Sequence, residues 1–463
     1  MGDKLLVRAY NVGCGDCIYI RIPNESDGRH ILIDCGKKGD DALLKKALDD
    51  LVQNELPSAG GGKKRLDLIV ATHRHEDHIK GFNPDWFKNI QVKHIWLSAA
   101  MDPQHPQAEK MRALHQFADH AMKEMKAQGV ALSPEIELLA SLYGVSNDIA
   151  DQCLMKDLPA ANEINPSYVH AGMSSKDLGV DLDDATIHVL GPEKDIDRYY
   201  LGEEADTSLR SLHGIAMAFK SRSTPAADKV PTNISAADFH QLQSRLLSNG
   251  LSFAEKDSEI QNNTGVVLLL EWRKRRLLFV GDAEWAGEFR EGKQNGSWNV
   301  MWEKQHDKLL KAPIDFLKIG HHGSINATPP PPDHIRRSAG ARSRGQGPSV
   351  KEILDTILPL PKEGKKPRAQ AITSTEREFY NPIPEGMLLV ELGKRVASTR
   401  NYRKALKAKG IKEESIWTSP KAMKNHFFEK YEEKFLGELQ PLRTDLEHLL
   451  NPDKNFVEVE IAA

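Results

Sequence analysis

Three histidines and an aspartate lie within six residues of one another in the run ATHRHEDHIKGF, which spans residues 71–82. They are His73, His75, Asp77 and His78. Neutral imidazole nitrogens and a carboxylate oxygen are ligands of zinc, or of manganese where carboxylates contribute more. The alternative is a polar loop that happens to be rich in histidine. Four ligating side chains in this order favour a metal site.

The residues just before this cluster predict how it is held. The run LDLIVATH, from Leu66 to His73, is apolar and β-branched, which is typical of a buried strand that opens into a loop at its carboxyl end. His73 and His75 can then point to one side. Asp77 and His78 follow on the turn into a helix, where they can face a second ion.

Two later segments offer further ligands. The run RLLFVGDAE (276–284) predicts a strand that ends at Gly281-Asp282, and IDFLKIGHHGSINATP (314–329) predicts a strand that runs into His321-His322. The preceding apolar run GVVLLLEW and the basic turn RKRR predict a hairpin, which would bring Asp282 to the edge that holds the histidine cluster. The sequence therefore predicts a metal centre assembled from three segments.

The full set of motifs resembles a known family. YNVGCGDCIYIRI (10–22) and HILIDCG (30–36) look like the opening strands of the metallo-β-lactamase fold, whose signature is His-x-His-x-Asp-His. The combination of VGxGD, LIDxG, HxHxDH, GDAE and LKxGHHGS is most similar to the hydrolase domain of the ComEC-type competence proteins and to their soluble relatives. The resemblance implies an α/β fold, an αββα sandwich, and a metal-dependent hydrolase.

The resemblance also implies roles for the ligands. His73 and His75 would hold a first ion, Asp77 and His78 a second, and Asp282 would bridge the two. Two divalent cations, zinc or alternatively manganese, would share and activate a hydroxide, which Asp77 could also orient. No convincing third histidine for the first ion is apparent in the sequence.

One histidine of the His321-His322 pair would complete the second ion site. Adjacent side chains at a strand end diverge, so we assign His322 to the metal. His321 would then stabilise an oxyanion or protonate the leaving group, and the reversed assignment stays open. Asp16 is expected to accept the second ring N–H of a ligand histidine. The alternative for Asp16 is a surface turn.

Substrate contacts are expected from residues around this centre. Asn263 could line the site or lie in a solvated turn, and Ser324 could contact substrate or cap its own turn. Asn381 stands where the relatives carry the histidine of a Gly-His-Pro triplet, and asparagine cannot carry a proton in its place. Arg336 and Arg337 lie in a proline-led loop that could bind a phosphate backbone, or could be a solvated loop without a ligand.

The pattern along the chain predicts one interrupted domain. The hydrolase domain would cover residues 1–400, with a helical insertion at about 102–178 and a polar insertion at about 193–260. Residues 401–463 are rich in charges at helical spacing and predict a helical C-terminal appendage that packs on the fold or on a protein partner. The last residues could form an edge strand.

Composition excludes some functions. The chain has 463 residues and a net charge of −3, so any nucleic-acid binding must rest on local patches. No apolar run reaches the roughly 20 residues that cross a bilayer, and no signal-peptide core is present, so we expect a cytoplasmic protein without a membrane partner. The four cysteines are too scattered for a disulfide framework, and the Cys14–Cys17 spacing is interpreted as structural packing, with metal binding or redox chemistry as the alternative.

Three functions remain at this point. The first is a phosphodiesterase or nuclease, with single-stranded nucleic acid or another phosphodiester as substrate. The second is a hydrolase of a small phosphoester, lactone or amide. The third is a non-catalytic component of a bacterial defence or regulatory assembly.

Overall fold

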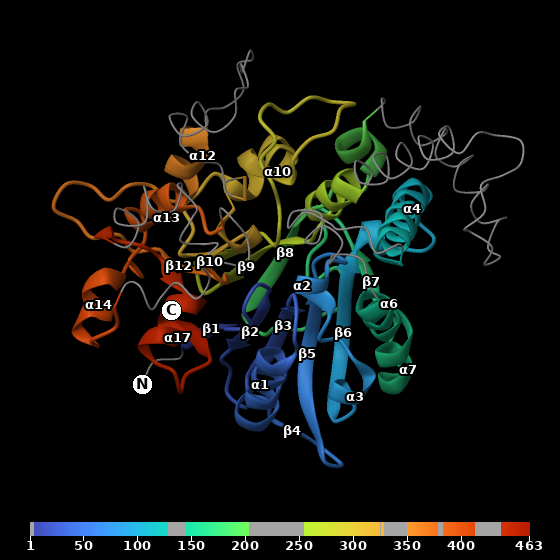
Figure 1. Ribbon diagram of the computed structural model, residues 1–463, viewed down its shortest axis with the longest axis horizontal. Coiled ribbons are helices and arrows are strands. Elements are labelled where there is room, and N and C mark those ends of the chain that lie inside the picture. The colour runs from blue at the N-terminus through green and yellow to red at the C-terminus, as the bar shows by residue number, and fades with distance from the viewer. Residues whose placement is uncertain are drawn as a thin grey trace, which may run out of the picture.

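Two β-sheets lie face to face in the computed structural model, with helices on both outer sides (Figure 1). The structure describes residues 4–127, 145–202, 254–324, 326–327, 350–377, 383–412 and 437–463. Within these residues, no helix combines the length and the apolar character needed to cross a membrane.

The first sheet has the strand order β14-β1-β2-β3-β5-β6-β7, and β4 pairs with β5. Strands β1, β2, β3 and β14 pair antiparallel, whereas β3, β5, β6 and β7 run parallel. The strands are β1 (Lys4–Tyr10), β2 (Cys17–Ile22), β3 (Arg29–Cys35), β4 (Ser58–Gly60), β5 (Lys63–Ala71), β6 (Ile90–Ser98), β7 (Ser167–Val169) and β14 (Phe456–Ala462).

The second sheet has the order β13-β12-β11-β10-β9-β8. Strands β10 to β13 run parallel, and the predicted hairpin is formed by β9 and β10. Its two turn residues, Arg273 and Lys274, both have positive φ, as a tight hairpin turn requires. The strands are β8 (Ala185–Gly191), β9 (Val267–Trp272), β10 (Arg275–Phe279), β11 (Phe316–Ile319), β12 (Gln370–Thr373) and β13 (Leu442–Arg443).

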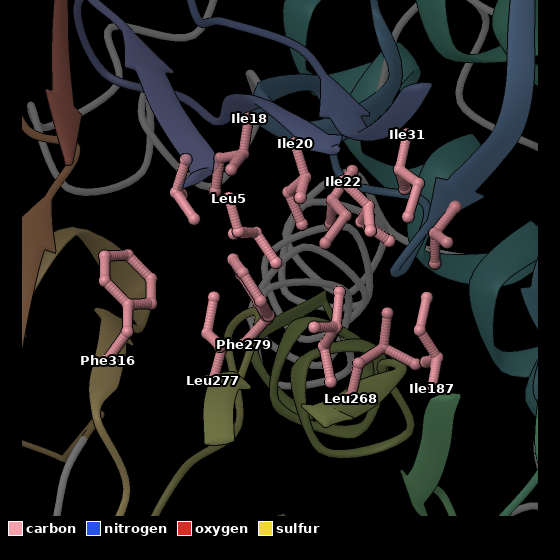
Figure 2. Close-up of a cluster of buried hydrophobic side chains, with 14 of the residues drawn as sticks. Leu5, Ile18, Ile20, Ile22, Ile31, Ile187, Leu268, Leu277, Phe279 and Phe316 are labelled. Atoms are coloured by element: carbon pink, nitrogen blue, oxygen red, sulfur yellow. The ribbon is translucent and has the colours of Figure 1, made fainter. Parts of the chain in front are cut away.

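The main core lies between the two sheets, where side chains of both interdigitate (Figure 2). Leu268 of β9 points into this core, while its neighbour Leu269 packs on the opposite side of the same sheet. Both faces of β9 are therefore buried, which explains why its sequence is an unbroken apolar run. The labelled core residues are Leu5, Ile18, Ile20, Ile22 and Ile31 from the first sheet, and Ile187, Leu268, Leu277, Phe279 and Phe316 from the second.

Helices close the outer face of each sheet with a core of their own. The first sheet is covered by α1 (Ala42–Asp50), α3 (Pro84–Phe87), α6 (Val145–Gln152) and α7 (Leu158–Asn162). The second is covered by α10 (Ser297–Gln305), α12 (Val350–Ile357) and α13 (Gly386–Gly393). The predicted αββα sandwich is confirmed.

The C-terminal part differs from the predicted helical appendage. Although α14 (Tyr402–Ala408) and α17 (Thr444–Leu450) are helical, β13 joins the second sheet and β14 pairs with β1. The run FVEVEIA alternates apolar and charged residues, so a strand buries one of its faces. β14 also covers a β1 edge that would otherwise be open.

The region predicted as a helical insertion contains α4 (Ala108–Ala127), α6 and α7, but it also supplies β7 to the first sheet. Most of the predicted polar insertion, residues 203–253, lies outside the described residues. What is described on its two sides is a π-helical turn at Asp197–Leu201 and a helical stretch over residues 254–263.

Candidate metal centre

The three motif segments meet where β5, β10 and β11 end. The backbone N–H of Val266 donates to Thr72 O at 2.9 Å, which joins the start of β9 to the end of β5. The N–H of His321 donates to Gly281 O at 3.2 Å and to the Asp282 carboxylate at 3.1 Å. Loops from both sheets are thus held together at one edge of the sandwich.

A first group of ligating atoms comes from His73, His75 and Asp282. These atoms all lie within 4.8 Å of one another, and the three side chains are buried. His73 Nε2 is 3.0 Å from His75 Nδ1 and 3.9 Å from Asp282 Oδ2. The arrangement is suited to one divalent cation.

A second group is formed by His78, Asp282 and His322, again within 4.8 Å and buried. His78 Nε2 lies 3.2 Å from Asp282 Oδ2. Asp282 belongs to both groups, as a bridging carboxylate must.

Asp77 is placed differently from our expectation. It groups with His322 and Cys14 rather than with His78. Its Oδ2 is 3.2 Å from His322 Nε2 and 3.2 Å from the Lys38 ammonium. The first turn of α2 (Glu76–Ile79) explains this, because successive residues on a helix project in different directions.

The electrostatics suit cation binding. Burial lowers the pKa of His73 well below its ordinary value and that of His75 to about 4, so both rings are neutral and can ligate. Burial also disfavours charge on His78, but the carboxylates of Asp282 and Asp34 outweigh it and raise the pKa of His78. A bound cation would replace that proton as the partner of Asp282.

Some buried polar atoms of the centre lack the hydrogen-bond partners that they would need in the absence of a cation. Among the described residues, His75 Nε2 and Asp77 Oδ1 are buried without a hydrogen-bond partner. Buried polar atoms without partners are costly in folded proteins. Nitrogen and carboxylate donors of this kind fit divalent metal ions.

The second ring nitrogen of the ligand His78 contacts Asp34, whereas Asp16 was the expected partner of a ligand histidine. Asp34 Oδ2 lies 2.7 Å from His78 Nδ1, and both Asp34 oxygens accept hydrogen bonds from Thr72. The sequence reasoning missed Asp34, although the LIDxG motif contains it. Its backbone lies in the left-handed region, with φ of 56°, which aspartate tolerates better than most residues.

Asp16 has another role. Its Oδ2 accepts a hydrogen bond from Lys318 Nζ at 2.9 Å, and both side chains are buried. The Asp16 N–H donates to Asp77 O, and its carbonyl accepts from Gly36 N, each at 2.9 Å. Asp16 therefore joins the β1–β2 loop to the ligand-bearing turn and, through Lys318, to β11.

The His321-His322 pair diverges as expected. Both residues have positive φ, 42° and 53°, and lie in a short turn after β11. The His322 side chain is 1% exposed and contacts Asp77, whereas the His321 side chain is 25% exposed. His321 Nδ1 lies 3.4 Å from Glu284 Oε1. This placement favours His322 as the ligand and leaves His321 open to a substrate.

Asn263 does not line the centre directly. Its side-chain amide donates to Glu284 Oε2 at 3.2 Å, and its oxygen accepts from the N–H groups of Glu284 and Ser297. Asn262 donates to Glu284 Oε1 at 2.9 Å. Burial raises the pKa of Glu284 to about 7, although the hydrogen bonds from Asn262 and Asn263 lower it. Glu284 is the last residue of the GDAE motif, yet no role for it was predicted from the sequence.

The remaining expected substrate contacts are less informative. Ser324 Oγ donates to Asn326 Oδ1, which is the turn-capping alternative. Asn381, Arg336 and Arg337 lie outside the described residues. A basic cavity of about 480 Å³, lined in part by Lys274 and Lys362, lies at the opposite ends of β10 and β11 and is not part of the centre.

The histidine cluster lies in a part of the chain that is similar to known proteins. Residues 11–142 match the family model described as the metallo-beta-lactamase superfamily, and this stretch contains His73, His75, Asp77 and His78. A ribonuclease Z from Bradyrhizobium sp. (strain ORS 278) is 32% identical over 69 residues, which are 15% of this chain and 18% of that protein. The chain thus spans less than a fifth of this relative.

Two solved structures are only distantly similar. A mutant of the CmlA beta-hydroxylase has a TM-score of 0.32 and 12% identity, and the match covers 81% of this chain and 46% of that one. A protein of unknown function from Enterococcus faecalis has a TM-score of 0.29 and 9% identity, with 68% and 49% covered. The chain spans about half the length of each of these two proteins.

Proposed function

Given the metallo-β-lactamase superfamily domain matched over residues 11–142, we propose that this protein is a metal-dependent hydrolase that cleaves phosphodiester bonds. The observation that carries the proposal is Asp282, whose carboxylate belongs to two groups of buried ligating side chains at once. A carboxylate in that position suits a pair of cations that act on one substrate atom.

The residues that would hold the cations are His73, His75 and Asp282 on one side, and His78, Asp282 and His322 on the other. When bound, two divalent ions make water a stronger nucleophile and stabilise charge on a phosphoryl oxygen. Zinc is the favoured ion because most of the ligands are imidazoles, with manganese as the alternative.

The chain's own groups would prepare the rest of the reaction. Asp34 fixes the ring of His78 so that Nε2 faces Asp282. Lys38, with a side chain 5% exposed, places an ammonium beside Asp77 and partly balances the buried carboxylates. His321 is the partly exposed imidazole of the centre, and we assign it the transfer of a proton to the leaving oxygen.

Phosphodiesters are favoured over other esters by two observations. The sequence similarity over 69 residues is to a protein named ribonuclease Z. The chain also carries Arg336 and Arg337 shortly after the His321-His322 turn, and guanidinium groups suit phosphate oxygens. Single-stranded nucleic acid is therefore the proposed polymeric substrate.

A substrate panel tests the proposal. The metal-loaded protein is incubated with single- and double-stranded DNA, RNA, bis-p-nitrophenyl phosphate and a lactone, each with zinc and with manganese. We expect cleavage of the phosphodiesters, loss of it in Asp282→Ala, and little change in a control, Asp183→Ala, whose carboxylate pairs with Arg29 on the surface. Cleavage of the lactone alone would contradict the assignment and favour a small-ester hydrolase.

A further inference from the structure

Cys14, interpreted from the sequence as a packing residue, lies beside the candidate metal ligands. The side chain is 1% exposed, and Cys14 groups with Asp77 and His322. Its sulfur, an Asp77 carboxylate oxygen and a His322 ring nitrogen all lie within 4.8 Å of one another. The three side chains come from the β1–β2 loop, from α2 and from the turn after β11.

The loop that carries Cys14 is tied to the ligand-bearing segments. Asp16 N donates to Asp77 O, and Lys38 N donates to Cys14 O, each at 2.9 Å. The N–H of Cys14 itself donates to Glu376 Oε2 at 3.1 Å. The sulfur is therefore held near Asp77 by backbone contacts on both sides.

Glycine makes this close approach achievable. A Cβ atom on Gly15 would lie 2.3 Å from Gly36 O, and one on Gly36 would lie 2.3 Å from His78 N. Side chains at these two positions would push the Cys14 loop away from the segment that holds Asp77 and His78.

A second observation points to a cation at this place. Asp77 is 2% exposed, and its Oδ1 has no hydrogen-bond partner among the described residues. Its other oxygen already faces a positive charge, the Lys38 ammonium at 3.2 Å. The site beside Cys14 is thus buried and contains a carboxylate oxygen without a hydrogen-bond partner in the described part of the chain.

We propose that Cys14 is a sulfur ligand of the second cation, the one that His322 would hold, with Asp77 beside it; the inference rests on the proposed metal-dependent function. On binding, the thiol gives its proton to solvent and the thiolate donates an electron pair to the cation. Thiolate is a soft ligand that suits zinc, whereas manganese prefers oxygen donors. Cys14 thereby makes this centre selective for zinc over manganese.

Cobalt substitution tests the inference without relying on activity. Visible d–d bands report that cobalt is bound, and a near-ultraviolet sulfur-to-cobalt charge-transfer band reports a thiolate ligand. We expect both in the wild type, loss of the charge-transfer band with retained d–d bands in Cys14→Ser, and both bands in the control Cys153→Ser. Cys153 is a buried free cysteine on the helical side of the first sheet, outside the ligand groups.

The outcomes separate the two proposals. Bound cobalt without a charge-transfer band in the wild type, or an unchanged band in Cys14→Ser, overturns the role of Cys14 and leaves the hydrolase proposal standing. Absence of any cobalt bands overturns both. Cys14→Ala is measured beside Cys14→Ser, with circular dichroism as a check on folding, and the wild-type spectrum decides even if neither variant folds.

Discussion

Asp34 Oδ2 lies 2.7 Å from His78 Nδ1, while the other nitrogen of the same ring faces Asp282 Oδ2 at 3.2 Å. A proton on Nδ1, donated to Asp34, leaves the Nε2 lone pair free for a cation. Asp34 is itself fixed by two hydrogen bonds from Thr72 at the end of β5. The orientation of the His78 ring thus depends on Asp34 in β3, the strand next to β5.

Replacing Asp34 by asparagine should weaken metal binding. The change removes the charge that supports the Nδ1 proton and sets an amide against the Thr72 donors, so we expect a loss of about 10–100-fold in metal affinity. Competition with a chromogenic chelator measures it. Asp183→Asn is the matched control, since Asp183 has a φ of 57° but pairs with Arg29 at the surface. Equal affinity in both variants would contradict the role of Asp34.

Much of the centre is predictable from the sequence because its ligands lie in short motifs at strand ends. His73, Asp282 and His322 could be recognised in this way, and strand ends at one edge of a sandwich are brought together by the fold. Contacts between segments that are distant in the sequence could not be predicted. Lys318 meets Asp16 at a separation of 302 residues, and Asp34 meets His78 at 44. Nothing local in the sequence indicates which buried carboxylate takes which partner.

In the fold, too, local elements could be predicted from the sequence, whereas pairings between distant segments could not. Alternating or unbroken apolar runs predict most strands, and the β9–β10 hairpin follows from its turn. The alternation in FVEVEIA likewise predicts the edge strand β14. Its partner could not be predicted, because β1 lies at the far end of the sequence and no local pattern indicates the pairing.

His321 and His322 should behave differently when each is replaced by asparagine. His322 contacts Asp77 and is buried, so His322→Asn should lose bound metal. His321→Asn should keep its metal content but lose about 10²–10⁴-fold in kcat, the usual contribution of a proton-transferring group. Metal analysis and steady-state kinetics on bis-p-nitrophenyl phosphate measure both. The opposite pattern would reverse the two roles.

The buried pair of Asp16 and Lys318 should be important for stability. Lys318→Met leaves the Asp16 charge buried without its partner, so we expect a loss of about 3–5 kcal/mol in unfolding free energy. The double change with Asp16→Asn should recover part of this loss. Urea unfolding measures it, and Lys4→Met, in an exposed pair with Glu460, should cost less than about 1 kcal/mol. A similarly small loss for Lys318→Met would refute the prediction.

Asp67 should make stability depend on pH in the acid range. Burial alone would raise the pKa of its carboxyl, but hydrogen bonds from Lys93 and the His30 N–H outweigh it and lower that pKa. A lowered folded-state pKa gives stability that is complete above the unfolded-state value and is lost as the pH falls through the folded-state value.

Asp67→Asn should therefore lower the unfolding free energy at pH 7 by about 1.5–3 kcal/mol, the range for a hydrogen bond to a charged group. The difference from wild type should shrink as the pH falls below the ordinary range of a carboxyl group. Urea titrations at neutral and acid pH compare the two proteins. A difference that does not change with pH would mean that the Asp67 charge has no part in stability.

The most direct test of the account is a count of bound metal ions together with phosphodiester hydrolysis, in wild type and in Asp282→Ala. Native mass spectrometry of the zinc-loaded protein gives the count, and bis-p-nitrophenyl phosphate gives the rate. Because the Asp282 carboxylate belongs to both ligand groups, we predict two ions in the wild type, fewer in the variant, and hydrolysis only by the wild type. A wild type that binds at most one ion, or a variant that keeps both ions and its activity, would contradict a two-metal centre bridged by Asp282.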